Sequence, residues 1–175
     1  KNSKGLFYGG TKLEPQHKFV KEQLDKLGLL NSVRKLVLID VHSGLGPMGE
    51  DTLMTGTSTT ENEKNLKTFF PGSYKIVQTH GSESDVVDGY ELTMGDVGDN
   101  YPNVFENLTN VVSFTQEFGT YSSIKVGVSL IIENQSFHDR SDGVHNRGLY
   151  ETFCPSNPFF RENVIKRGTE LIDQS

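Results

Sequence analysis

In the stretch KLVLIDVHSGLGPMGE (residues 35–50), an apolar run passes directly into a segment rich in glycine. Its apolar run from Leu36 to Val41 predicts a buried strand, and a glycine-rich loop follows at once. Side chains two residues apart in a strand point to the same face, so Asp40 and His42 are expected on one face. An aspartate beside a histidine can hold one ring nitrogen and leave the other for a metal. The alternative is a strand-end Asp-x-His that only caps a turn, and these residues alone leave both interpretations open.

A second strand end carries another candidate residue. In VVSFTQEFGTYS (residues 111–122), a predicted strand ends at Glu117, and Gly119 and Thr120 then open a helix. In parallel α/β sheets, functional groups gather where strands end and helices begin. A carboxylate at such a point can be a general base, a metal ligand or a partner of the helix dipole. The sequence has no Gly-x-Ser-x-Gly elbow, so nothing in it supports nucleophilic catalysis.

The rest of the chain alternates predicted helices and strands. Apolar residues at helical spacing follow Pro15, and Gly28 is a plausible stop. Asn157-Pro158 is a strong helix start, with Phe160, Val164, Ile165, Leu171 and Ile172 as the apolar face of that helix. Between these lie a predicted helix from Thr60 to Phe70, a strand over 74–79, a long polar loop over 80–100, a short helix near Pro102, a strand over 111–118 and a helix over 122–134. This alternation predicts one α/β layered domain over residues 1–175.

Composition narrows the class of protein. The 17 basic and 23 acidic residues give a net charge of −6, which disfavours binding to nucleic acid. Cys154 is the single cysteine, which excludes a disulfide framework and a thiolate metal cage and favours a cytoplasmic location. No apolar run approaches the roughly 20 residues that cross a bilayer, so no membrane role is expected.

Four blocks of the sequence carry a resemblance to a known superfamily. They are GLFYGG (5–10), IDVHSGLGPMGE (39–50), QEFGTYS (116–122) and ETFCPSNPFFRENVIKRGTELIDQ (151–174). In this order they resemble the C-terminal half of a branch of the zinc carboxypeptidase superfamily, related to the succinylglutamate desuccinylase and aspartoacylase deacylases. The resemblance implies a three-layer α/β/α domain with a mixed, mostly parallel sheet, of which this chain is the C-terminal part.

The resemblance also implies roles for single residues. His42 falls at the position of the third zinc ligand, and Glu117 at that of the glutamate that takes a proton from the attacking water. Asp40 would hydrogen-bond His42 from behind. Tyr90 is the candidate for a tyrosine that closes over the substrate, with Tyr101 as the second choice. The implied reaction is zinc-dependent hydrolysis of an amide bond in a small peptide or an N-acyl amino acid.

One departure from the superfamily limits this expectation. The superfamily draws its first two zinc ligands from a His-x-x-Glu upstream of the third, and none lies between Lys1 and His42. A catalytic zinc takes about three protein ligands, so we expect a fragment of a longer enzyme whose other zinc ligands lie upstream. The missing segment or a partner would then cover the sheet edge. The alternatives are a non-catalytic relative that uses the same cleft for binding or assembly, and an unrelated α/β domain with coincidental motifs.

Overall fold

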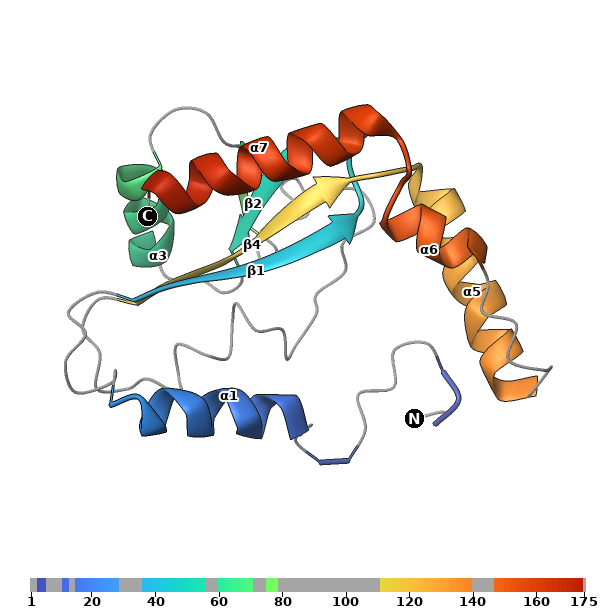
Figure 1. The fold of residues 1–175 in the computed structure, drawn as a ribbon, viewed down its shortest axis with the longest axis horizontal. Coiled ribbons are helices and arrows are strands. Elements are labelled where there is room, and N and C mark those ends of the chain that lie inside the picture. The colour runs from blue at the N-terminus through green and yellow to red at the C-terminus, as the bar shows by residue number, and fades with distance from the viewer. Residues whose placement is uncertain are drawn as a thin grey trace.

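A computed structural model describes residues 3–5, 11–12, 15–28, 36–55, 60–70, 75–78, 111–139 and 147–174 of the chain. These ranges contain a mixed α/β arrangement, as the sequence predicts (Figure 1). In chain order the elements are α1 (Pro15–Lys26), β1 (Leu36–Gly44), β2 (Asp51–Thr55), α3 (Thr60–Phe69), β3 (Lys75–Gln78), β4 (Val111–Gly119), α5 (Ser123–Asp139), α6 (Arg147–Phe153) and α7 (Pro158–Gln174).

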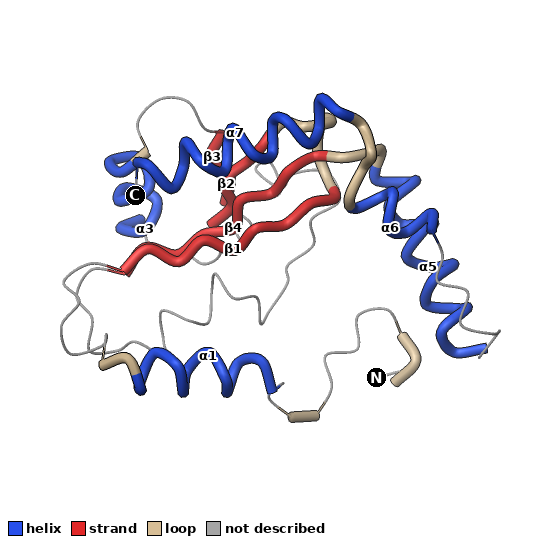
Figure 2. Tube along the Cα trace, viewed as in Figure 1, coloured by secondary structure: helices blue, strands red, loops and turns tan. Residues whose placement is uncertain are grey.

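The four strands of these ranges form one sheet in the order β1-β4-β2-β3 (Figure 2). β1 runs parallel to β4, and β2 runs parallel to β3, whereas β2 and β4 are antiparallel. The sheet is therefore mixed, with two parallel pairs and one antiparallel pair. β2 was not predicted from the sequence; it follows the glycine-rich loop directly and pairs antiparallel with β4.

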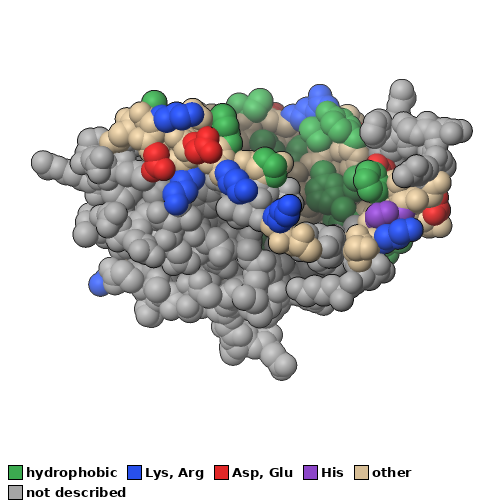
Figure 3. Space-filling view, turned by 90° about the horizontal axis from the view of Figure 1, so that it is seen from below, with side chains coloured by type: hydrophobic (Ala, Val, Ile, Leu, Met, Phe, Trp, Pro, Cys, Tyr) green, Lys and Arg blue, Asp and Glu red, His purple; other side chains and the backbone are tan. Residues whose placement is uncertain are grey.

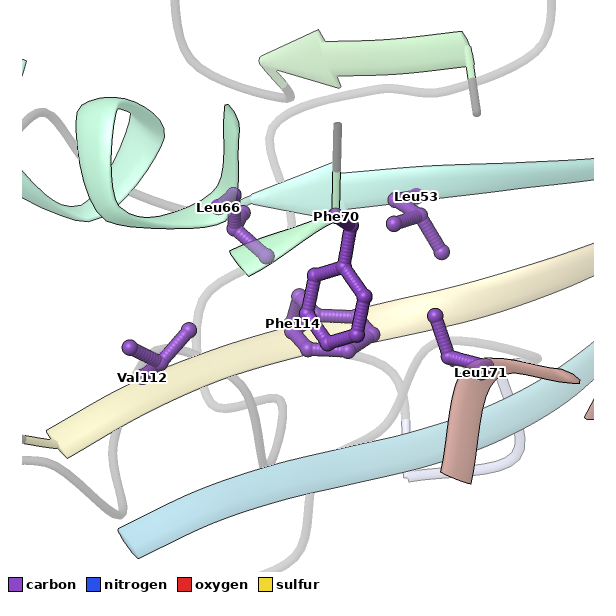
Figure 4. Packing of buried hydrophobic residues seen from close by; sticks show 6 residues of the cluster. All are labelled: Leu53, Leu66, Phe70, Val112, Phe114 and Leu171. Carbon is purple, nitrogen blue, oxygen red and sulfur yellow. The ribbon is translucent and has the colours of Figure 1, made fainter. Parts of the chain in front are cut away.

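An apolar core covers one face of the sheet (Figure 4). Phe114 of β4 meets Phe70 edge to face at 5.3 Å between ring centroids, a favourable geometry for aromatic pairs. Val37 and Ile39 of β1 pack against this cluster, so the odd-numbered residues of β1 face the core. The cluster consists of Leu53, Leu66, Phe70, Val112, Phe114 and Leu171, which come from the sheet, from α3 and the residue after it, and from α7.

The helix boundaries follow local signals in the sequence. Gly28, just beyond α1, adopts a φ of 62°, the left-handed conformation that commonly ends a helix. At α7, Asn157 Oδ1 accepts a hydrogen bond from the N–H of Phe159 at 2.9 Å, which confirms the predicted N-cap. The predicted apolar face of α7 is only partly correct. Phe160 and Leu171 are buried, whereas Ile165 and Ile172 are 71% and 65% exposed, because they lie one residue further round the helix.

Two helices differ from the expectation, and one predicted region lies outside the described residues. α5 extends to Asp139, beyond the predicted end at residue 134, and α6 was not predicted at all. The expected loop over 80–100 and the helix near Pro102 lie outside the described residues. Within the described ranges, none of the helices is long and apolar enough to cross a membrane.

Helices lie on both sides of the sheet. α3 and α7 lie on the side of the apolar core, and α1 lies on the opposite side (Figure 1). Viewed from below, the described side chains of this second side mix Lys and Arg with Asp and Glu in the half where α1 lies (Figure 3).

Candidate functional site

The candidate site lies on the face of the sheet that points away from the apolar core. Strand alternation explains this, since Val37 and Ile39 face the core and Asp40 and His42 therefore face the other way. In the parallel pair β1–β4, His42 lies opposite Glu117, and Asp40 lies opposite Thr115. Side chains at paired positions share a face, so the register brings three sequence-predicted residues together: Asp40, His42 and Glu117.

The imidazole of His42 lies between two carboxylates. Its Nε2 is 3.0 Å from Oδ2 of Asp40, a hydrogen-bonding distance, and its Nδ1 is 3.9 Å from Oε2 of Glu117. The side chain of His42 is 48% exposed, whereas that of Glu117 is only 5% exposed. Asp40 therefore holds one ring nitrogen, and the other ring nitrogen faces the buried carboxylate across a gap too long for a hydrogen bond.

The glycine-rich loop fixes the other oxygen of Glu117. The backbone N–H of Leu45 donates a hydrogen bond to Oε1 at 2.9 Å. The two oxygens of Glu117 thus have different surroundings, because one is held by the loop backbone and the other faces the imidazole. A carboxylate oriented in this way can exchange a proton, through Oε2, with a group placed beside His42.

Two glycines, Gly46 in the loop and Gly119 at the end of β4, let the loop pack this closely. Gly46 has a φ of 118°, which side-chain-bearing residues rarely adopt. A methyl group at Gly119 would collide with the backbone of Gly46 and Pro47. Backbone hydrogen bonds lock the contact, from Gly49 N–H to Gly119 O at 2.9 Å and from Gly119 N–H to Glu50 O at 2.9 Å. The glycines of the loop were predicted to allow a close approach of the backbone, but the packing of Gly119 against them was not predicted.

The remaining predicted residues are not brought to this site by the described part of the chain. Tyr90 and Tyr101 lie outside the described residues. Among the residues that are described, no group of three or more His, Cys, Asp or Glu side chains could hold a metal ion. The described arrangement therefore offers one imidazole and one oriented carboxylate, with a second carboxylate behind the imidazole.

A His-x-x-Glu motif that was not named among the candidate ligands follows β3, in HGSE at His80 and Glu83. Both residues lie outside the described ranges. β3 is parallel to β2, and β2 is antiparallel to β4. The C-terminal ends of β3 and β4 therefore point in opposite directions, and β3 ends away from Glu117. The motif also follows His42 in the chain, whereas the superfamily places it before the third ligand.

Comparison with known proteins identifies a family for almost the whole chain. Residues 1–167 match the family described as "Protein of unknown function (DUF2817)". No curated protein and no solved structure matches the chain.

Proposed function

The chain belongs to the DUF2817 family, and from its site geometry we propose that it acts in zinc-dependent hydrolysis of amide bonds. The type would be that of a carboxypeptidase or an N-acyl amino acid deacylase, in keeping with the resemblance of its motifs to the zinc carboxypeptidase superfamily. The single observation that carries the proposal is the placement of His42 between Asp40 at 3.0 Å and Glu117 at 3.9 Å. A turn-capping Asp-x-His requires no buried glutamate opposite the histidine.

The imidazole of His42 is of a type that binds zinc, and it would be one of several ligands of the ion. Metal-binding histidines commonly donate their second ring N–H to a carboxylate, and Asp40 is placed to accept from Nε2 of His42. Nδ1 is then the nitrogen that would bind the ion. Further ligands would come from residues other than those described, because a catalytic zinc takes about three. When bound, zinc would polarise the substrate carbonyl and lower the pKa of water.

Glu117 would move the proton. Its Oε2 faces the imidazole, and Leu45 N–H holds its Oε1, so the carboxylate is oriented without help from substrate. In the proposed reaction a water oxygen bonds to the amide carbonyl carbon while Glu117 takes the proton of that water. The carbon–nitrogen bond then breaks, and Glu117 gives the proton to the leaving amine. The products are a carboxylate and an amine.

The first test is zinc content, measured by elemental analysis on the protein at its full natural length. We expect about one zinc per chain, lost in His42→Ala and retained in His138→Ala, which removes a histidine of α5. Zinc that is absent from the wild-type protein, or retained in His42→Ala, would overturn the metal site.

The second test is turnover of peptides and N-acyl amino acids. Glu117→Gln should reduce kcat by at least about 100-fold, the lower range for loss of a general base, and should keep its zinc. Glu162→Gln, on the exposed side of α7, serves as the matched control. Full activity in Glu117→Gln would remove this residue from the mechanism. A zinc-bound protein without amide hydrolysis would favour the alternative, a carboxypeptidase-like module that binds without catalysis.

A further inference from the structure

Gly44 continues the row of Asp40 and His42 along one face of β1. Alternate residues of a strand are spaced by about 7 Å, but Gly44 adds no side chain to the row. A methyl group placed on Gly44 would lie 3.1 Å from Cε1 of Phe153 and 3.3 Å from Oε1 of Glu117. The ring of Phe153, which comes from α6, therefore takes the place of a third side chain. The row consists of a carboxylate, an imidazole and an aromatic ring.

Several hydrogen bonds fix α6 in this position. The hydroxyl of Ser43 donates to the carbonyl oxygen of Phe153 at 2.6 Å, which ties the end of α6 to β1. The hydroxyl of Tyr121, just beyond β4, donates to Oε1 of Glu151 at 3.3 Å. Within the helix pair, the hydroxyls of Ser129 and Thr152 lie 3.0 Å apart. α6 is thus attached to both strands of the candidate site and to α5.

The surroundings of Glu117 are consequently polar on one side and apolar on the other. His42 lies on the polar side, and the half-buried ring of Phe153 lies on the apolar side. An apolar substrate group against the ring would lose contact with water at a gain of free energy. A charged group at the same place would lose hydration without a compensating partner from the ring.

We propose that Phe153 is a specificity-determining residue that selects amides with an apolar group next to the reacting carbonyl. The inference rests on the proposed amide hydrolysis and assigns the preference to one side chain, the Phe153 ring beside Gly44 and Glu117. Gly44 contributes to the same preference, because the absence of a side chain there leaves room for the Phe153 ring.

The test uses three amides and the protein at its full natural length. N-acetylglycine is the reference, N-benzoylglycine adds an apolar group on the acyl side, and N-acetylphenylalanine adds one on the amine side. We expect the wild-type protein to prefer at least one apolar compound over the reference. In Phe153→Ala, KM for that compound should rise about tenfold relative to KM for the reference compound, while the ratio of the two kcat values changes little. Phe153→Leu should retain much of the preference, because it keeps an apolar side chain.

The matched control is Phe137→Ala, which removes a 76% exposed phenylalanine from α5. It should leave all three KM values unchanged. A parallel measurement in the Glu117→Gln background records the dissociation constants of the three amides by calorimetry, without turnover. In the double variant Glu117→Gln with Phe153→Ala, we expect the preferential binding of the apolar amide to be lost.

The outcomes separate the two proposals. Hydrolysis whose substrate preference is the same in Phe153→Ala overturns the role of Phe153 and leaves the hydrolase standing. Apolar binding that depends on Phe153 without any hydrolysis overturns the hydrolase and supports the apolar subsite. Absence of both hydrolysis and preferential binding overturns both.

Discussion

Asp40 Oδ2 lies 3.0 Å from His42 Nε2, and this contact sets the direction of the imidazole ring. With Nε2 directed to Asp40, Nδ1 faces Glu117 at 3.9 Å. The two residues are separated by one position on β1, so strand geometry alone places both side chains on one face. Asp40 can thus act on the site through His42, as a positioning residue.

Removal of Asp40 should weaken zinc binding without unfolding the protein. In Asp40→Ala the imidazole loses the acceptor that holds its orientation, and we expect zinc affinity to fall about 10- to 100-fold. Competition with a chromophoric chelator measures this affinity in the full-length protein. Asp139→Ala, at the exposed end of α5, is the control and should bind zinc like the wild type. An unchanged affinity in Asp40→Ala would show that Asp40 does not support His42.

A methyl group added at Gly119 should destabilise the folded protein, whereas one added at Gly168 should not. The added carbon at Gly119 would meet the backbone of Gly46 and Pro47, which cannot move aside as a side chain can. We expect Gly119→Ala to lower the free energy of unfolding by about 3 kcal/mol. Gly168 in α7 has open space, so Gly168→Ala should stabilise the protein by about 1 kcal/mol.

Urea denaturation measures both changes. Because the two substitutions are chemically identical, their opposite signs test the contact and not the residue type. Equal stability of Gly119→Ala and the wild type would mean that the loop does not pack against β4 as described.

Sequence patterns succeeded where a local signal decides the structure. The apolar run of β1, the Asn157 cap and the stop at Gly28 depend on neighbouring residues, and each is found where expected. The face shared by Asp40 and His42 follows from the period of a strand alone. Their approach to Glu117 depends on the register of two strands that are far apart in the chain, which local patterns do not encode.

Elements fixed by tertiary contacts were missed. β2 is short, has only five residues and alternates weakly, so its pairing with β4 identifies it better than its sequence does. α6 has seven residues and is held by hydrogen bonds to Ser43, Tyr121 and Ser129, none of which is its neighbour in sequence. The position of Phe153 beside Gly44 was missed for the same reason.

Glu151 should make folding stability depend on pH in the acid range. Its Oε1 accepts hydrogen bonds from the N–H and hydroxyl of Ser156 and from Tyr121. The backbone N–H of Ser156 is the main cause that lowers the pKa of Glu151 below its ordinary value of 4.5. A lowered pKa stabilises the folded state above the unfolded value, and this contribution is lost as pH falls through the folded value.

The difference in unfolding free energy between the wild type and Glu151→Gln should therefore be largest above pH 4.5 and shrink below it. Urea denaturation between pH 3 and 7 measures the difference, roughly across the range in which carboxylates titrate. Ser156→Ala removes the hydroxyl donor and keeps the backbone N–H, so it should show a smaller effect with the same pH dependence. A difference that is constant with pH would contradict this account.

The buried carboxylate of Asp51 connects β2 to β4 and α7. It accepts a hydrogen bond from Gln116 Nε2 at 2.8 Å through one oxygen and from Arg167 Nε at 2.8 Å through the other. The side chains of Asp51 and Arg167 are 5% and 21% exposed, so water solvates the carboxylate poorly. Arg167 also binds Glu170, which is 39% exposed.

Replacement of Arg167 should therefore lower the free energy of unfolding much more than replacement of its exposed partner Glu170. Arg167→Met leaves the Asp51 charge buried and should lower the free energy of unfolding by about 3 kcal/mol. Glu170→Gln removes an exposed charge and should change it by about 0.5 kcal/mol or less. If the pair acts as a unit, the double variant Asp51→Asn with Arg167→Met should be less destabilised than the sum of the single variants, by about 1 kcal/mol or more. Additive single and double effects in urea denaturation would show that Asp51 and Arg167 contribute independently.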